Sequence, residues 1–270
     1  MLLPIGDDNQ GRLTTPFVVY AIIAVNVLVF LLLQQAGMTP QGERFTYGYA
    51  VVPYEITTGE DLTGPVVVRD SGATANGPRS RMGERPAAIP EAPGPSPIYL
   101  TLLTAMFMHG GWMHILGNML YLWIFGDNVE DNFGHGKFII FYLICGLAAS
   151  FAQIAIDPSS PIPSLGASGA IAGVLGAYIV MFPHNRVRTL VPLFIIFTTI
   201  ELPALVVIGL WIVLQVISQY TTTFSHTTQA SGVAYMAHIG GFITGLLLSF
   251  VFRSRQRRRN LPPFYDPYQR

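Results

Sequence analysis

Long apolar runs separated by short polar links constrain this chain more than any other feature of its sequence. Three of them are Phe17 to Leu33, about Phe138 to Ile156, and Gly232 to Phe252. Each matches the roughly 17 to 25 residues that cross the hydrocarbon core of a bilayer. Charged residues make up only 11% of the sequence, whereas an average soluble domain carries about 25%. The sequence therefore predicts an integral membrane protein that crosses the bilayer several times.

The apolar runs predict an all-α membrane protein, a bundle of six transmembrane helices. The expected helices are Phe17 to Leu33, Trp112 to Phe125, Phe138 to Ile156, Ala167 to Phe182, Pro203 to Ser218 and Gly232 to Phe252. Gly, Pro and charged residues favour turns and lie between these runs. The apolar piece from Thr189 to the Glu201-Leu202-Pro203 break is expected to be a hydrophobic loop near the surface.

Three segments are expected outside the six helices. Residues 1–16 are a cytoplasmic N-terminal tail, residues 253–270 are a basic cytoplasmic C-terminal tail, and residues 34–97 are a long first extramembrane loop within the domain 17–252. The loop carries twelve charged residues together with Pro and Gly clusters, a composition that is incompatible with lipid. Short strands or turns are expected at Phe45 to Val52 and at Gly64 to Val68.

The distribution of basic residues predicts the orientation in the membrane. An arginine cluster begins directly after the sixth apolar run and comprises Arg253, Arg255, Arg257, Arg258 and Arg259. Short segments rich in Lys and Arg stay in the cytoplasm, so with six spans both termini are expected there. The long first loop then lies outside. The expected location is the plasma (inner) membrane.

Four polar side chains stand at equivalent places in three of the predicted helices. His114 and Asn118 lie near the start of the second helix, Ser168 opens the fourth, and His238 lies a turn or two into the sixth. These three helices run in the same direction, so the four side chains are expected at a similar depth below the outer surface. Polar residues inside a membrane are costly and indicate function by default.

Helix spacing brings these residues closer still. His114 and Asn118 are four residues apart and share one helix face. Gly241 and Gly245 follow His238 on one face of the sixth helix, and glycines let helices approach closely. That face is therefore expected to pack on the small-residue face of the fourth helix, with His238 near Ser168. The Gly-x-Ser-Gly stretch is also open to a simpler interpretation, a packing face without chemistry.

The chain resembles the rhomboid family of intramembrane serine proteases. The resemblance rests on three motifs in order on the second, fourth and sixth helices: His114-x-x-x-Asn118, Gly166-Ala167-Ser168-Gly169, and Ala237-His238-x-x-Gly241-x-x-x-Gly245. It implies a six-helix rhomboid bundle and an endopeptidase that cleaves peptide bonds in or near the transmembrane segments of membrane proteins.

The resemblance also implies roles for the four polar residues. Ser168 is the implied nucleophile, His238 is its general base, and His114, Asn118 and the Ser168 backbone N–H form an oxyanion site. Such a serine protease needs no cofactor and no metal. The expected partners are transmembrane protein substrates and the lipid bilayer, whereas the net charge of zero gives no reason to expect nucleic acid binding.

Several positions depart from the family pattern or stay open. Some members have a Tyr one turn after the nucleophile that stacks on the catalytic His, but here that position is Ala172, and no acid lies where it could orient His238. A catalytic dyad is therefore expected, without a known orienting group. Trp211 and Phe194 belong either to a mobile gate on the fifth helix or to ordinary lipid-facing packing. Glu201 is expected to support the start of the fifth helix.

Two other functions compete with proteolysis. A zinc protein would use His109, His114 and His238 as nitrogen ligands. A non-catalytic family member would bind and escort membrane helices, although such proteins typically lack Ser or His at the positions that Ser168 and His238 occupy. Sensitivity to a chelator separates the zinc protein from the serine protease.

Overall fold

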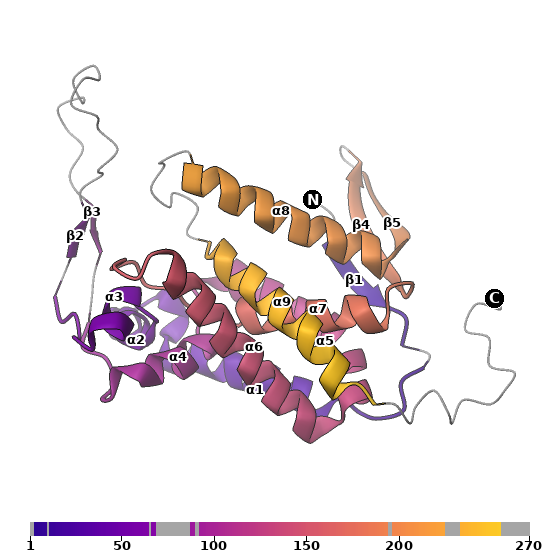
Figure 1. Ribbon diagram of the computed structural model, residues 1–270, viewed down its shortest axis with the longest axis horizontal. Helices are drawn as coiled ribbons and strands as arrows, with labels where there is room; N and C mark the ends of the chain where they lie inside the picture. The colour runs from indigo at the N-terminus through magenta and orange to yellow at the C-terminus, as the bar shows by residue number, and fades with distance from the viewer. Residues whose placement is uncertain are drawn as a thin grey trace, which may run out of the picture.

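The computed structural model describes residues 3–9, 11–64, 66–68, 87–89, 92–193, 196–224 and 233–254. Most of these residues are helical, and the long helices lie side by side as a bundle (Figure 1). The long helices are α1 (Phe17–Leu28), extended by the π-helical turn η1 (Val29–Leu33), α5 (Trp112–Phe133), α6 (His135–Ile156), α7 (Ser168–Met181), α8 (Ala204–Phe224) and α9 (Tyr235–Phe252).

Only some of the predicted spans form helices that are both long enough and apolar enough to count as a full membrane crossing within the described residues. Among the described residues, three helices are long and apolar enough to span a bilayer: α6, α8 over Ala204–Thr222, and α9. The apolar segments Phe17–Leu33 and Ser168–Met181 are shorter. A further short apolar segment, Ile98–Phe107, precedes α5 and consists of η3 (Ile98–Leu100), α4 (Thr101–Thr104) and η4 (Ala105–Phe107).

Helix α7 lies at the centre of the bundle and packs against α5, α6 and α9. Its contact with α9 is made by glycine backbones. A Cβ built on Gly245 would lie 1.9 Å from the Gly173 carbonyl oxygen, and one built on Gly241 would lie 2.0 Å from that of Gly169. Any side chain at these positions would push the helices apart. The predicted packing of the Gly241–Gly245 face on the small-residue helix is confirmed.

The first loop contains more helix than its composition suggests. It holds the 3-10 turn η2 (Gln35–Gly37), α2 (Pro40–Tyr49) and α3 (Pro53–Thr58). The expectation of strands or turns at Phe45 to Val52 is therefore wrong over most of its length. The helix α2 begins there because Thr39 caps it, accepting a hydrogen bond from Gly42 N–H at 3.1 Å, and because Pro40 occupies its first turn. Val66–Val68 does form a strand, β2, which pairs with β3 (Ala87–Ile89).

A three-stranded antiparallel sheet corrects the all-α prediction. Its order is β1 (Leu3–Asp7), β4 (Arg186–Leu193) and β5 (Ile196–Pro203). The apolar segment expected to be a surface loop is thus the β4–β5 hairpin, whose many β-branched residues favour strands. Glu201 lies opposite Arg188 and accepts a hydrogen bond from Arg186 Nη1 at 3.3 Å. The first N–H groups of α8 donate instead to the Asn185 and Pro183 carbonyls, and its first turn has no acidic residue, so the role predicted for Glu201 at the start of the fifth helix is wrong.

Helix α5 does not end at Phe125, where the sequence predicted its end. It continues for two more turns to Phe133, and its last turns bury the polar residues Asp127, Asn128, Glu130 and Asp131. These residues stay helical because the N-terminal segment supplies their partners. The sequence analysis placed residues 1–16 in a tail, whereas the structure packs the described part of this segment, residues 3–9 and 11–16, against the end of α5.

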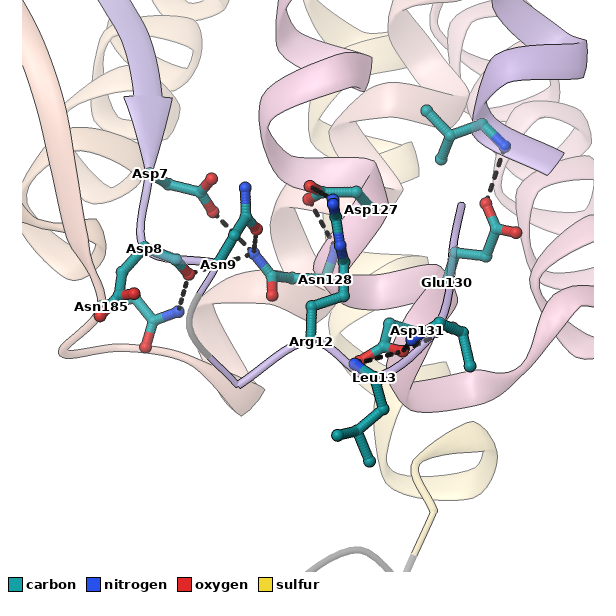
Figure 2. Close-up of polar contacts among 12 residues, drawn as sticks. Asp7, Asp8, Asn9, Arg12, Leu13, Asp127, Asn128, Glu130, Asp131 and Asn185 are labelled. Carbon is teal, nitrogen blue, oxygen red and sulfur yellow. Dashed lines mark hydrogen bonds and ion pairs between the residues drawn. The ribbon is translucent and has the colours of Figure 1, made fainter. Parts of the chain in front are cut away.

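Figure 2 shows the polar contacts between the N-terminal segment and α5. Arg12 Nη1 forms an ion pair with Asp127 Oδ2 at 2.5 Å. Asn128 Nδ2 donates to Asp7 Oδ2 at 2.9 Å, and the Tyr178 hydroxyl donates to the same oxygen at 2.6 Å. Burial, followed by the nearby charge of Asp127, raises the pKa of Asp7 to about 7, although both hydrogen bonds oppose this shift. The N-terminal segment is therefore fixed to the bundle by side chains of α5 and α7.

Glu130 caps the start of α1 from a different helix. Its carboxylate accepts hydrogen bonds from the backbone N–H groups of Val18 at 2.9 Å and Val19 at 2.7 Å, and the Glu130 side chain is fully buried. We expect Glu130→Ala to lower the free energy of unfolding by about 1 to 3 kcal/mol, because buried donors lose their acceptor. The buried thiol of Cys145, the single cysteine, provides the measurement: a thiol-reactive dye labels it on thermal unfolding.

Glu201→Ala is the matched control for this variant. It removes the same side chain from an exposed ion pair, in which Arg186 and Glu201 expose 72% and 48% of their side chains. Exposed pairs contribute about 0 to 1 kcal/mol, so the unfolding temperature should hardly change. Equal shifts for the two variants would contradict the capping role of Glu130.

Candidate active site

Ser168 is the first residue of α7 and follows a tight turn. The preceding Gly166 has φ 136°, a backbone conformation that favours glycine, and its N–H donates to the Ala105 carbonyl at 2.9 Å. A Cβ on Gly166 would lie 3.0 Å from the His114 ring. Glycine at this position therefore allows the loop to approach His114 and fixes Ser168 at the helix N-terminus.

The structure brings Ser168 and His238 together. His238 lies in the first turns of α9, and its Nε2 is 2.8 Å from Ser168 Oγ, a hydrogen-bond distance. The close glycine packing of α9 on α7 sets this distance. A hydroxyl held against an imidazole nitrogen can transfer its proton to that nitrogen when the oxygen attacks an electrophile.

His114 lies in the first turn of α5 beside the same turn. Its Nδ1 accepts a hydrogen bond from the Gly110 backbone N–H at 3.2 Å. In the neutral imidazole the other nitrogen then carries the proton. His114 Nε2 and Cε1 each lie 3.0 Å from a Cβ built on Gly166, so the edge of the ring that carries the Nε2 proton lies beside the turn before α7.

Asn118 lies one turn further along α5 and is 8% exposed. Its Nδ2 is buried and has no hydrogen-bond partner among the residues that the structure describes. A buried donor without a partner is costly and calls for an explanation. An oxygen atom of a bound ligand would satisfy it.

The N-terminus of α7 adds backbone donors to this site. The Ile171 N–H donates to the Ala167 carbonyl at 3.0 Å, so the N–H of Ser168 precedes the hydrogen bonds within the helix. Such N–H groups and the helix dipole favour a negative charge at this position. A cavity of about 340 Å³ opens beside it, and its lining includes Ser168, His114, Gly110 and Gln153.

The second ring nitrogen of His238 faces α8. Gln215 Oε1 lies 2.8 Å from His238 Nδ1, and the Trp211 ring packs on the imidazole with 5.7 Å between the ring centroids. Sequence reasoning missed Gln215, although one signal was present: it is the first polar side chain after ten apolar residues and glycine in α8. Ala172, at the position where some rhomboids have a Tyr, is fully buried.

The three histidines of the zinc alternative do not form a ligand set. In the described ranges, no group of three His, Cys, Asp or Glu side chains could hold a metal ion. His109 is 2% exposed, and its ring lies edge-on to the His114 ring with 5.1 Å between the ring centroids. The side-chain amide of Gln34 holds the His109 backbone through two hydrogen bonds of 2.9 Å. Phe194, considered with Trp211 as part of a gate, lies outside the described residues.

Comparisons with known proteins agree on one family. The protein-family model described as the Rhomboid domain matches residues 97–255, more than half of the chain. RHOMBOID-like protein 5 of Arabidopsis thaliana is 30% identical over 166 residues, which are 62% of this chain and 48% of that protein. Rhomboid protease GluP of Bacillus subtilis is 44% identical over 85 residues, 32% of this chain and 16% of that protein.

A mitochondrial relative has a similar match. Rhomboid protein 1 of Saccharomyces cerevisiae is 29% identical over 175 residues, 59% of this chain and 45% of that protein. The chain thus spans less than half the length of each of these three relatives. The matched residues include the turn before α7, the first turns of α5 and all of α9.

Proposed function

Because this chain belongs to the rhomboid family of multi-pass helical membrane proteins, we propose that it is an intramembrane serine endopeptidase. Its substrates are membrane proteins, cleaved in or near their transmembrane segments. The observation that carries the proposal is the 2.8 Å contact between Ser168 Oγ and His238 Nε2. Relatives described as rhomboid proteases, such as GluP of B. subtilis, support it.

In the proposed reaction Ser168 is the nucleophile and His238 is the base. Ser168 Oγ attacks the carbonyl carbon of the scissile bond while its proton passes to His238 Nε2. His238 then gives this proton to the leaving amine, and the peptide C–N bond breaks to leave an acyl ester on Ser168. Water, deprotonated by His238, attacks the ester and releases the new carboxylate, which restores the Ser168 hydroxyl.

Three donors surround the position of the developing oxyanion. They are the Nε2–H of His114, the Nδ2 amide of Asn118 and the backbone N–H of Ser168. The Asn118 Nδ2, which has no hydrogen-bond partner in the described part of the chain, and the tautomer of His114, set by Gly110, support these roles. Donors fixed in advance stabilise a negative charge without reorganisation, which makes this one of the largest contributions in acyl transfer.

Cleavage by the purified protein tests the proposal directly. The protein in detergent is incubated with a single-span membrane protein, with Ser168→Ala as its control and phenanthroline added in parallel. Product from the wild type alone, unaffected by the chelator, is the expected result. Activity lost with the chelator would favour metal chemistry, and binding without cleavage would favour the escort function.

We also propose six spans in the domain 17–252 with both termini in the cytoplasm of a plasma (inner) membrane. The N-terminal strand β1 pairs with β4, and Ser254 N–H at the end of α9 donates to Asn132 Oδ1 of α5 at 3.2 Å. These contacts support a common membrane side for the N-terminal segment, the β4–β5 hairpin and the end of α9. The arginine-rich 253–270 segment supports the cytoplasm as that side.

Fusion reporters test this orientation. A reporter that is active only in the cytoplasm should be active after Arg259 and inactive when inserted in the first loop near Gly77. The opposite pattern would place Ser168 near the cytoplasmic surface and would overturn the proposed topology.

A further inference from the structure

The imidazole of His238 is held at both of its nitrogen atoms. Ser168 Oγ lies 2.8 Å from Nε2, and Gln215 Oε1 lies 2.8 Å from Nδ1. The two contacts come from different helices, α7 and α8. Within the described residues, the acids of the protein are not among the partners of this ring, so Gln215 occupies the place that a carboxylate takes in a Ser-His-Asp triad.

The contact with Gln215 selects one tautomer of the ring. A carbonyl oxygen only accepts hydrogen bonds, so its partner Nδ1 must carry the proton. The neutral ring then presents the lone pair of Nε2 to the Ser168 hydroxyl. This is the tautomer that a general base needs, whereas the opposite tautomer would place an N–H against Oγ and could not take its proton.

The same helix also fixes the plane of the ring. Trp211 precedes Gln215 by one turn of α8, and its ring packs on the imidazole at an interplanar angle of 39°. Because Ala172 provides no aromatic ring from α7, support for His238 comes from α8. The neighbours of Gln215 on this helix, Leu214 and Val216, are about half exposed, so the amide is the polar exception on an apolar helix.

We infer that Gln215 is a positioning residue that holds His238 in the Nδ1–H tautomer and thereby makes Nε2 available to Ser168. This inference rests on the proposed protease function. Gln215 acts through His238, because it meets Nδ1, whereas Ser168 Oγ meets the other ring nitrogen, Nε2. Since it belongs to α8, which packs mainly on α9, the correct orientation of the base depends on α8 lying against α9.

Three variants separate this role from simple packing. Gln215→Leu removes the acceptor at similar volume, Gln215→Glu keeps an oxygen at the same place, and Gln219→Leu removes the same amide one turn further along α8. A positioned general base contributes about 10²- to 10⁴-fold. We expect Gln215→Leu to lose roughly 10- to 100-fold in kcat, since the ring can still reach the reactive tautomer without the amide. KM should stay nearly unchanged.

The two other variants should keep most of the activity. Gln215→Glu restores an acceptor for Nδ1–H, and Gln219→Leu leaves the pair intact. Wild-type cleavage together with an unimpaired kcat in Gln215→Leu would overturn the inference while leaving the proposed function standing. A loss in Gln215→Leu that Gln215→Glu does not restore would also overturn it.

A measurement without substrate tests the tautomer itself. Nitrogen NMR of protein labelled with ¹⁵N-histidine, recorded at alkaline pH where the ring is neutral, should place the His238 proton on Nδ1 in the wild type. Gln215→Leu should show a mixture of tautomers, and Gln219→Leu should resemble the wild type. A proton on Nε2 in the wild type would refute the inference whether or not the protein cleaves a substrate.

Discussion

Replacement of Ser168 by Ala is expected to abolish cleavage. The hydroxyl at 2.8 Å from His238 Nε2 is the proposed nucleophile, and no acyl ester can form without it. Loss of the nucleophile or the base of such a pair costs on the order of 10⁶-fold in kcat. Product release from a transmembrane substrate, followed over days at high enzyme concentration, provides the range that this measurement needs.

His238→Ala should reduce cleavage as far as Ser168→Ala does. Because nucleophile and base act as one unit, the double variant should lose no more than either single one. Both substitutions leave the glycine contacts of α7 with α9 in place, so labelling of Cys145 should report almost the same unfolding temperature. Turnover close to the wild type in either folded variant would contradict the proposed catalytic pair of Ser168 and His238.

A fluorophosphonate should label the wild type and fail to label Ser168→Ala.

Replacement of Asn118 by Ala should produce a smaller, measurable loss. Loss of one oxyanion donor costs on the order of 10²- to 10³-fold in kcat, or roughly 3 to 4 kcal/mol, because His114 and the Ser168 N–H still face the charge. The effect should fall on kcat more than on KM, since these donors meet a full negative charge only near the transition state. His114→Ala should show a loss of the same order.

Asn26→Ala provides the matched control for Asn118→Ala. Asn26 is a fully buried asparagine of α1, and its Nδ2 donates within the helix to the Ile22 carbonyl at 2.7 Å. The same substitution there should leave turnover unchanged. If Asn118 merely joins two helices, its replacement should lower the unfolding temperature and leave the turnover of the folded fraction intact. That outcome would exclude Asn118 from the oxyanion site.

The membrane class and the pairing of Ser168 with His238 could be predicted from sequence because both depend on local patterns. A run of apolar residues specifies a span by its length alone. Glycines spaced along two helices specify which faces can approach, and this fixed the contact of α9 on α7. The His114–Asn118 spacing placed two donors on one face of α5 in the same way.

Only the tertiary structure decided features that join distant segments. From sequence, the acidic end of α5 is predicted to be a polar link between helices. It is helical because the N-terminal segment, more than 100 residues earlier, supplies hydrogen bonds and an ion pair to its side chains. The β-branched residues of β4 and β5 favour strands locally, but the addition of β1 to their sheet joins segments far apart in the sequence.

The contact of Gln215 with His238 Nδ1 is also a feature that only the tertiary structure decided. The sequence by itself determined which residues carry the candidate chemistry, since their types and spacing are local. It could not determine what orients the base, because Gln215 reaches His238 only when α8 packs beside α9. The contact of α8 with α9 depends on the rotation of one helix against the other, and α8 has no repeated glycines of the kind that predicted the contact of α9 with α7.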